Sequence, residues 1–205
     1  MLTMSEGDLA RAASILKGGG LVAFPTETVY GLGANALDAN AVSGIFKAKG
    51  RPCDNPLITH IADKSRLEAL VEAVPAAAEK LIDAFWPGPL TIVMKKSRNV
   101  PDIVSAGLDT VGVRLPEHPV ALRFLTACGL PVAAPSANTS GKPSPTAAAH
   151  VAEDLAGKID AIVDGGKCGI GLESTVIDVS GEVPALLRPG GVTYEQLTSL
   201  LGEVL

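Results

Sequence analysis

Small hydroxyl and amide side chains gather in the segment APSANTSGKPSPT (134–146), directly after an apolar run typical of a buried strand. Its polar residues include Ser136, Asn138 and Ser144. Such donors, together with exposed backbone N–H groups, can bind phosphate or ribose oxygens. We predict that Ser144 also heads a helix whose positive end favours an anion. Helix capping by Ser144 is compatible with ligand binding, and the segment as a whole favours a ligand site over a plain loop.

Cations cluster where a predicted helix ends, at the turn KAKGRP. Arg51 lies between Gly50 and Pro52, close to Lys47 and Lys49. Two or three cations on a turn can clamp a polyphosphate, with arginine binding in a bidentate way. Lysines near a helix C-terminus can also do no more than offset the helix dipole. We assign the dipole role to Lys47 and a ligand role to Arg51.

Two more arginines lie in or directly after apolar strand patterns, Arg114 in VGVRLP and Arg188 in LLRPG. An unpaired guanidinium in such a place would be costly to bury, so each needs a carboxylate or a phosphate partner. A structural ion pair with one of the 22 acidic residues explains either arginine alone, and is a weaker explanation for both together.

Two glycine-rich segments follow other predicted strands. The first, PTETVYGLG, offers two hydroxyls and two glycines that would let a ligand approach the backbone, from Thr28, Tyr30, Gly31 and Gly33. Taken alone, it is better explained as a tight turn with a helix cap. The second, DGGKCGIGLESTV (164–176), leads into Ser174 at the start of a strand and could equally be a glycine-rich hairpin.

Several kinds of site are disfavoured by the motifs that the sequence lacks. There is no G-x-x-x-x-G-K-[ST] segment and no G-x-G-x-x-G between a strand and a helix, so a nucleotide would be held in another way. His60, His118 and His150 have no metal-ligand spacing, so we expect no metal held by protein ligands. A divalent ion carried by a phosphate group stays open.

The composition is that of a compact globule, with 47% apolar and 19% charged residues among 205. A formal net charge of −5 argues against a surface adapted as a whole to polyanions. The N-terminus carries no signal-peptide pattern, and no apolar stretch approaches the ~20 residues of a membrane span. Cys53, Cys128 and Cys168 are far apart, which fits a reducing compartment, and we expect a cytoplasmic protein with no membrane partner.

Strand and helix patterns alternate along the chain. Helices are predicted after Ser5, over 39–49, 75–86, 119–128 and 144–158, and after Thr193. Strands are predicted within 21–26, 56–62, 90–96, 110–116, 130–137, 159–166, 174–180 and 185–190. Consecutive parallel strands need a crossover helix, and the closely spaced late strands favour antiparallel pairs. We therefore predict one α/β domain over residues 1–205, with a mixed parallel and antiparallel sheet and flanking helices.

Seven motifs together resemble the YrdC-like family, the threonylcarbamoyl-AMP synthases, from about Gly18 to Gly190. In family order they are PTETVYGLG, KxRPxxNPL (49–57), WPGPLT (86–91), VRxPxHP (113–119), APSANxSGxPSPT, ESTVID and LRPG. The resemblance implies a twisted sheet with a basic concave face. It also implies an enzyme that joins L-threonine, bicarbonate and ATP into threonylcarbamoyl-AMP and pyrophosphate, for the modification of tRNA. Longer members carry a second domain, and we interpret this chain as the single-domain form.

The resemblance also carries site residues over to matching positions. The threonine pocket would be formed by Thr28, Tyr30, His60, Arg114, Ala134 and Ser174. The nucleotide would meet Arg51, Asn55, Thr110, Ser136, Ser144 and Arg188, to which we add Asn138 from the same loop. Lys49 and Arg51 would be the catalytic residues, and Lys49 and Tyr30 would lie where the two substrates meet.

This chemistry agrees with the residue types, because it needs donors and cations and no covalent nucleophile. We expect Mg²⁺ to enter with ATP, without protein ligands. The expected partners are tRNA-modification enzymes that accept the intermediate, with weak binding of tRNA or double-stranded RNA as a further expectation. Two alternatives stay open: an RNA-binding module, and a carbamoyl-adenylate domain of the hydrogenase-maturation type, which would use carbamoyl phosphate.

Overall fold

The computed structural model describes residues 1–205. The helices are α1 (Glu6–Lys17), α2 (Ala39–Lys49), α3 (Ala76–Phe85), α4 (Asp102–Ser105), α5 (Pro119–Cys128), α6 (Ala148–Leu155) and α7 (Tyr194–Leu201), with a 3₁₀ helix at Lys64–Ala69. The strands are β1 (Val22–Phe24), β2 (Gly31–Asn35), β3 (Ile58–His60), β4 (Leu90–Lys95), β5 (Thr110–Arg114), β6 (Val132–Ala133), β7 (Ala161–Ile162), β8 (Thr175–Asp178) and β9 (Ala185–Arg188). No helix is both long and apolar enough to cross a membrane.

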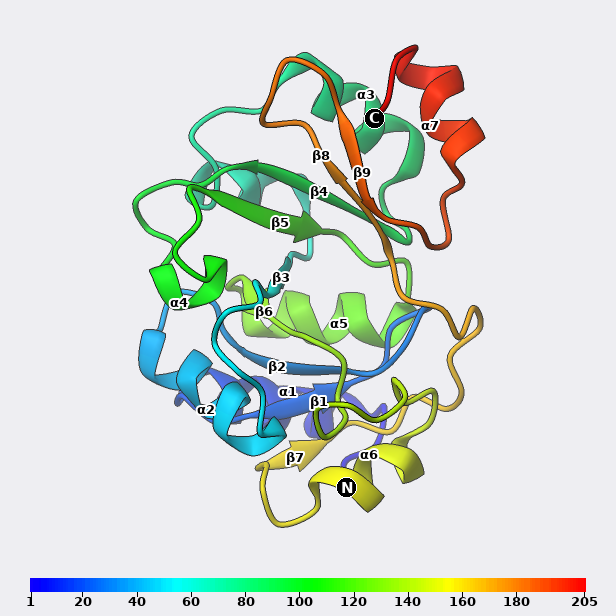
Figure 1. The fold of residues 1–205 in the computed structure, drawn as a ribbon. Coiled ribbons are helices and arrows are strands. Elements are labelled where there is room, and N and C mark those ends of the chain that lie inside the picture. Colours follow the sequence, from blue (N-terminus) through cyan, green and yellow to red (C-terminus); the bar gives the residue numbers. More distant parts are fainter.

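All nine strands belong to one sheet, in the order β7-β1-β2-β6-β3-β5-β4-β8-β9. The pairs β1–β7, β3–β5 and β4–β8 are parallel, and the other neighbours are antiparallel. The predicted α/β class with a mixed sheet and flanking helices is confirmed. Figure 1 shows that the sheet twists strongly, with β4, β5, β8 and β9 above and β1, β2 and β7 below.

Helices cover the lower strands on both faces, as the alternation of buried residues requires. In β1, Val22 and Phe24 pack into a cluster with α1 and α5, while Ala23 between them belongs to the cluster that includes α2. Helices α3 and α7 pack against each other at the upper right of Figure 1, and α3 also packs against β4. The front face of the upper strands is left without a helix.

Local signals place several helix ends correctly. Asp38 caps α2 by accepting hydrogen bonds from the N–H groups of Asn40 and Ala41. Gly50 ends the same helix in the left-handed conformation, at φ 63°. The reciprocal capping box of Thr193 and Gln196 starts α7. The chain therefore leaves α2 at the position where Arg51 was predicted to turn.

Two predictions are wrong in detail. Residues 31–35 form β2 and are not a turn, and Gly33 pairs with Val22 in the sheet. A Cβ at Gly33 would lie 2.8 Å from Cγ1 of Val132, so packing between strands, and no ligand, explains that glycine. Helix α6 begins at Ala148 and is capped at Ala147, so Ser144 does not head it. The physical reason is that the carbonyl oxygens of Pro145 and Thr146 accept hydrogen bonds from the N–H groups of Tyr30 and Cys168, so they are not available to a first helical turn.

Candidate active site

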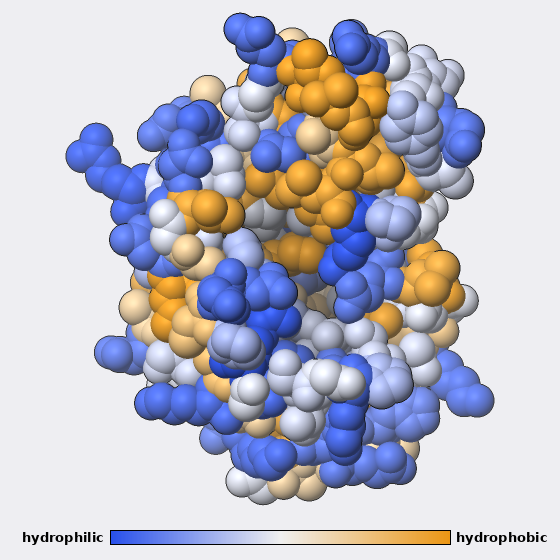
Figure 2. Space-filling view, viewed as in Figure 1, coloured by the Kyte–Doolittle hydropathy of each residue, from blue (hydrophilic) through white to orange (hydrophobic).

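A cavity of about 510 Å³ opens on the uncovered face of the sheet. Its volume is in the range that binds small-molecule ligands. Figure 2 shows this face hollowed near its middle, with hydrophobic surface above the hollow and mainly hydrophilic surface below it. The sheet supplies the floor, and the loops that follow β1, α2 and β6 supply the walls.

The floor is built by residues that the sheet brings into register. One row crosses four strands and contains Ile58, Gly112, Val93 and Asp178. Two positions further along the strands, His60 pairs with Arg114 and Thr91 pairs with Val176. Because alternate residues of a strand point to the same face, all of these line the cavity. The strand pattern thus forms a surface that combines apolar and polar groups.

Arg114 is held firmly at one end of this floor. Its guanidinium donates to Glu27 Oε1 at 2.5 Å, to Thr28 Oγ1 at 3.0 Å and to the Gly88 carbonyl oxygen at 3.2 Å. Both partners of the ion pair are nearly enclosed, with side chains 4% and 13% exposed for Arg114 and Glu27. Burial lowers the pKa of Arg114, and the Glu27 carboxylate opposes that shift. The arginine therefore stays charged in an otherwise dry place.

Arg188, the last residue of β9, is held in a similar way by residues that directly precede β8. It donates to Glu173 Oε2 at 2.5 Å, to the Ser174 carbonyl oxygen and to Ser174 Oγ, both at 3.0 Å. Ser174 Oγ also lies 2.8 Å from Thr91 Oγ1. Both Arg114 and Arg188 thus have carboxylate partners. Judged from the sequence alone, ion pairs are the weaker explanation for the two arginines together, but the structure contains both pairs.

Arg51 differs from the other two arginines. Its only hydrogen bond goes to the Asn55 carbonyl oxygen, at 3.4 Å, and no carboxylate lies within ion-pair distance. Its Nε is buried without a hydrogen-bond partner. Both residues line the cavity. Arg51 is therefore the arginine of the cavity with the most donors left for an anionic ligand.

Lys49 lies beside the cavity and does not line it. Its ammonium donates to the carbonyl oxygens of Ser136 and Asn138, the second at 2.6 Å. Burial lowers the pKa of Lys49 to about 8, and the charge of Arg51 acts in the same direction. The amide of Asn138 also bonds within its own loop, to the carbonyl oxygens of Thr139 and Lys142. Lys49 and Asn138 together fix the loop that presents Ser136 to the cavity.

Tyr30 and Ser144 also lie outside the lining. The Tyr30 hydroxyl donates to the Gly166 carbonyl oxygen at 2.7 Å and accepts from the Gly165 N–H at 3.2 Å. Burial raises its pKa to about 12. Ser144 reaches the cavity through a neighbour, since its hydroxyl donates to Glu173 Oε1 at 2.9 Å. These two side chains hold the loops that border the cavity.

His60 is a buried, neutral imidazole in the floor. Burial lowers its pKa to about 3, and the nearby positive charge of Arg114 acts in the same direction. Its ring meets the ring of Phe24 edge-on at 5.8 Å between centroids. Its Nδ1 is buried without a hydrogen-bond partner, although another part of the residue lines the cavity.

Most of the predicted site residues therefore meet in one place. The cavity is lined by Thr28, Arg51, Asn55, His60, Thr110, Arg114, Ala134, Ser136, Ser174 and Arg188. Predicted residues that support the loops around it instead are Tyr30, Lys49, Asn138 and Ser144.

Sequence reasoning did not assign a role to Glu27 or to Glu173, although both lie inside quoted motifs. The need of Arg114 and Arg188 for anionic partners was the available signal. It could not say which acidic residues would meet them, because Glu27 and Arg114 are 87 residues apart. Thr26, Thr91 and Asp178 also line the cavity without having been predicted.

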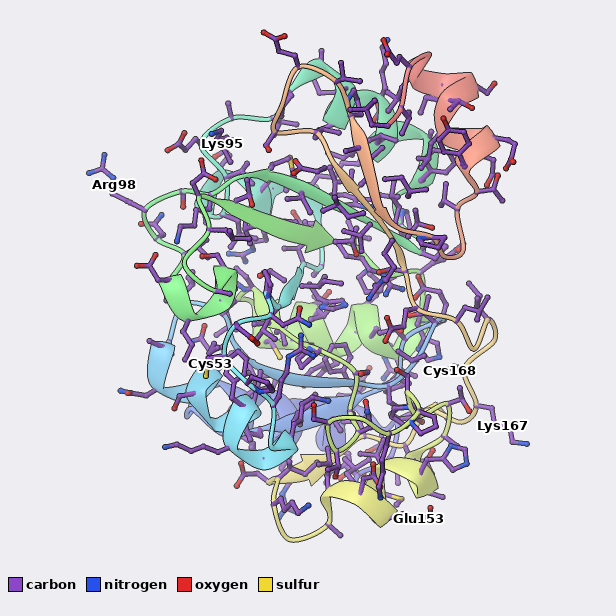
Figure 3. The ribbon with its side chains drawn as sticks, viewed as in Figure 1. Cys53, Lys95, Arg98, Glu153, Lys167 and Cys168 are labelled. Atoms are coloured by element: carbon purple, nitrogen blue, oxygen red, sulfur yellow. The ribbon has the colours of Figure 1, made fainter.

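Potential metal ligands are scattered: no group of three or more His, Cys, Asp or Glu side chains gathers in a way that could hold a metal ion. The cysteines are all free thiols. Figure 3 shows Cys53 beside the end of α2 and Cys168 in the loop that precedes β8, on opposite sides of the view. The polar side chains that line the cavity are hydroxyls, three guanidinium groups, one imidazole, one amide and the carboxylates of Glu173 and Asp178.

An open, mixed α/β sheet with a cavity of mixed apolar and polar lining on its uncovered face defines a class of ligand-binding α/β proteins, here with guanidinium groups and hydroxyls that suit an anionic ligand. A family sequence profile, Sua5/YciO/YrdC, described as "Telomere recombination", matches residues 14–190. The chain belongs to this family.

Named relatives extend the comparison. The chain is 57% identical to the threonylcarbamoyl-AMP synthase of Pyrococcus abyssi, over 98% of this chain and 59% of that protein. It is 54% identical to the threonylcarbamoyl-AMP synthase of Bacillus subtilis, over 99% and 59%. A solved structure of P. abyssi Sua5 complexed with L-threonine superposes with a TM-score of 0.96 at 57% identity, over 98% of this chain and 60% of that one. The chain thus spans about three fifths of the length of these relatives.

Proposed function

We propose that the chain is a threonylcarbamoyl-AMP synthase, which forms threonylcarbamoyl-AMP and pyrophosphate from L-threonine, bicarbonate and ATP. The observation that carries the proposal is the cavity itself. It combines Arg114 on the floor and Arg188 beside it, which both have carboxylate partners, with Arg51, which has none. The likeness to the P. abyssi protein crystallised with L-threonine adds support at 57% identity.

L-Threonine would lie on the floor. Arg114 presents N–H groups to its carboxylate, and the hydroxyls of Thr28 and Ser174 present partners for its polar groups. His60 and the small side chain of Ala134 would complete the lining of this pocket. Tyr30 would support this pocket from behind, through its bonds to Gly165 and Gly166.

ATP would lie above, toward the walls. The triphosphate would meet Arg51 and Arg188, with Ser136 and Ser144 as hydroxyl donors. Asn55 and Thr110 line the same cavity and would contact the nucleotide, and Asn138 would act by fixing its loop. Mg²⁺ would arrive as part of the ATP complex, as a substrate ion.

The reaction then needs alignment more than new covalent chemistry. Bicarbonate takes up a proton and loses water to give carbon dioxide. The amine of threonine attacks its carbon and releases a proton, which leaves the carbamate. A carboxylate oxygen of the resulting carbamate attacks the α-phosphorus, and the bond to the β-phosphate breaks, so pyrophosphate leaves. Arg51 would stabilise the negative charge that builds on the phosphates. Lys49 would contribute by holding Ser136 in position.

The wider setting is also part of the proposal. Three free cysteines support a reducing compartment, and we place the protein in the cytoplasm. The product would pass to enzymes that modify tRNA. Weak binding of tRNA or double-stranded RNA would be local, because the net charge is −5.

The test is to incubate the full chain with ATP, Mg²⁺, bicarbonate and L-threonine and to measure pyrophosphate release. We expect release that depends on threonine, with a product of the mass of threonylcarbamoyl-AMP. Release with carbamoyl phosphate in place of threonine would support a carbamoyl-adenylate enzyme instead. Salt-dependent RNA binding without any turnover would support an RNA-binding module, and either result would overturn the proposal.

A further inference from the structure

Glu173 occupies a place in the cavity that a phosphate group could take. Its carboxylate accepts from the Ser144 hydroxyl at 2.9 Å and from the Arg188 guanidinium at 2.5 Å. Both donors are residues that the proposed function assigns to ATP. A carboxylate and a phosphate oxygen accept the same charge-assisted hydrogen bonds from arginine, so Glu173 satisfies groups that would otherwise face the ligand.

The charge of Glu173 also acts on Arg51 in the wall and on Lys49 beside the cavity. Burial lowers the pKa of Arg51, and the Glu173 carboxylate opposes this shift more than any other charge does. Glu173 acts in the same sense on Lys49. One carboxylate therefore compensates a group of cations for which an incoming triphosphate would compete.

The contact of Glu173 with Arg188 is easier to open than the floor ion pair. The side chains are 39% and 36% exposed, whereas those of Glu27 and Arg114 are 13% and 4% exposed. An ion pair that reaches solvent is weak, because water replaces the lost partner on each side. The Glu173 side chain can move into solvent while Arg188 stays bonded to Ser174 through two other hydrogen bonds.

We propose that Glu173 is a displaceable occupant of the phosphate subsite: it holds Ser144 and Arg188 in place while the cavity is empty and releases both to a phosphate group of ATP. The inference rests on the proposed function, because it takes the triphosphate to bind between these residues. Glu173 is then a positioning residue that also lowers the affinity for ATP, since binding must break its two contacts.

Calorimetric titration of the full chain with ATP and with inorganic pyrophosphate, in the presence of EDTA, tests this. Glu173→Gln keeps the size of the side chain and removes its charge. We expect it to bind both ligands about fivefold more tightly than the unmodified protein, which is the factor that corresponds to about 1 kcal/mol. A residue with only a structural role would give weaker or unchanged binding when replaced.

Asp178→Asn is the matched control, because Asp178 lines the same cavity and bonds to the Ser180 N–H without touching an arginine. It removes one negative charge as well, so we expect a gain of less than twofold. Equal gains in the two variants, or no gain in Glu173→Gln, would overturn the inference. Failure of the unmodified protein to bind ATP when Mg²⁺ replaces EDTA would instead overturn the proposed function.

A crystal structure of the unmodified protein with pyrophosphate provides a check that needs no variant. We expect a phosphate oxygen within hydrogen-bond distance of both Ser144 and Arg188, with the Glu173 carboxylate turned away. A pyrophosphate bound in the cavity while Glu173 keeps both contacts would contradict the inference.

Discussion

The arginine on the floor of the cavity and the arginine on the turn after α2 differ in pairing and in burial. On the floor, Arg114 is enclosed and paired with Glu27, and three hydrogen bonds fix its orientation. On the turn, Arg51 has one long hydrogen bond and a buried Nε without a partner. Strands bring residues from distant parts of the chain together, whereas the turn presents its side chain alone.

This difference assigns two functions to different arginines: one orients a substrate, and the other attracts a polyphosphate. A paired arginine leaves no uncompensated buried charge, so it can orient a substrate at little electrostatic cost, whereas removal of either partner is strongly destabilising. An unpaired arginine adds positive charge where a polyphosphate would bind, at some cost in stability. We therefore expect replacements on the floor to change stability strongly, and replacement of Arg51 to change activity alone.

The largest effect is expected for Arg114→Ala. It would leave the Glu27 carboxylate buried without its partner and lower the free energy of unfolding by about 3–5 kcal/mol. Denaturant titration measures this, with Arg188→Ala as the matched control, which removes a half-exposed pair and should cost about 1 kcal/mol or less. Equal losses in the two variants would remove the distinction between an enclosed pair and an accessible one.

For Arg51→Ala we expect kcat/KM for ATP to fall about 100-fold, as for the loss of one donor to transition-state charge. The free energy of unfolding should change by less than about 0.5 kcal/mol, because Arg51 makes no ion pair. Lys47→Ala is the control: this exposed lysine lies in the last turn of the same helix and should keep nearly full activity. Full activity in Arg51→Ala would refute the role assigned to the turn.

The pH dependence of stability tests how dry the floor is. The folded-state pKa of His60 is about 3, below the usual 6.5. Between these two pH values the unfolded chain binds a proton at His60 and the folded protein does not. Stability from this group is complete above pH 6.5 and falls as the pH drops toward 3. Between pH 6.5 and pH 5 we expect a loss on the order of 2 kcal/mol that His60→Gln lacks. Parallel stability curves for the two proteins would place His60 in contact with water.

The smallest effect is expected for Ser174→Ala, which removes a hydroxyl bonded to Arg188 and Thr91. We expect about 1 kcal/mol less stability and a higher KM for L-threonine, with little change in the KM for ATP. Thr91→Val breaks the same hydroxyl pair and leaves Ser174 in place, so the KM for threonine should rise less. A larger rise in KM for ATP than for threonine would move Ser174 out of the threonine pocket.

Local sequence signals predicted much of the fold. Helix α2 with its cap at Asp38, the turn at Gly50 and the capping box at Thr193 depend on neighbours within a few residues, and all three are confirmed. Strand β2 escaped prediction because glycine is a poor strand former. Gly33 is explained by a contact with Val132 of β6, about 100 residues further along the chain, which no local pattern reveals, and Gly31 lies against Ala134 and lines the cavity.

The sequence predicted which residues belong to the site, and it did not predict how they contact one another. Arg51, Arg114 and Arg188 were identified because guanidinium groups in such places need partners. The sequence could not tell that two of them pair with Glu27 and Glu173, or that Lys49 points to loop carbonyls, because these contacts depend on sheet register and loop path. Tertiary structure alone decides which cation faces the ligand.

A crystal structure of the full chain with L-threonine and a non-hydrolysable ATP analogue tests the central claim most directly. We predict that threonine lies on the floor within hydrogen-bond distance of Arg114, and that the phosphates contact the guanidinium of Arg51. Phosphates bound at Arg114, with Arg51 facing solvent, would contradict the division of the cavity into a paired floor and an unpaired turn.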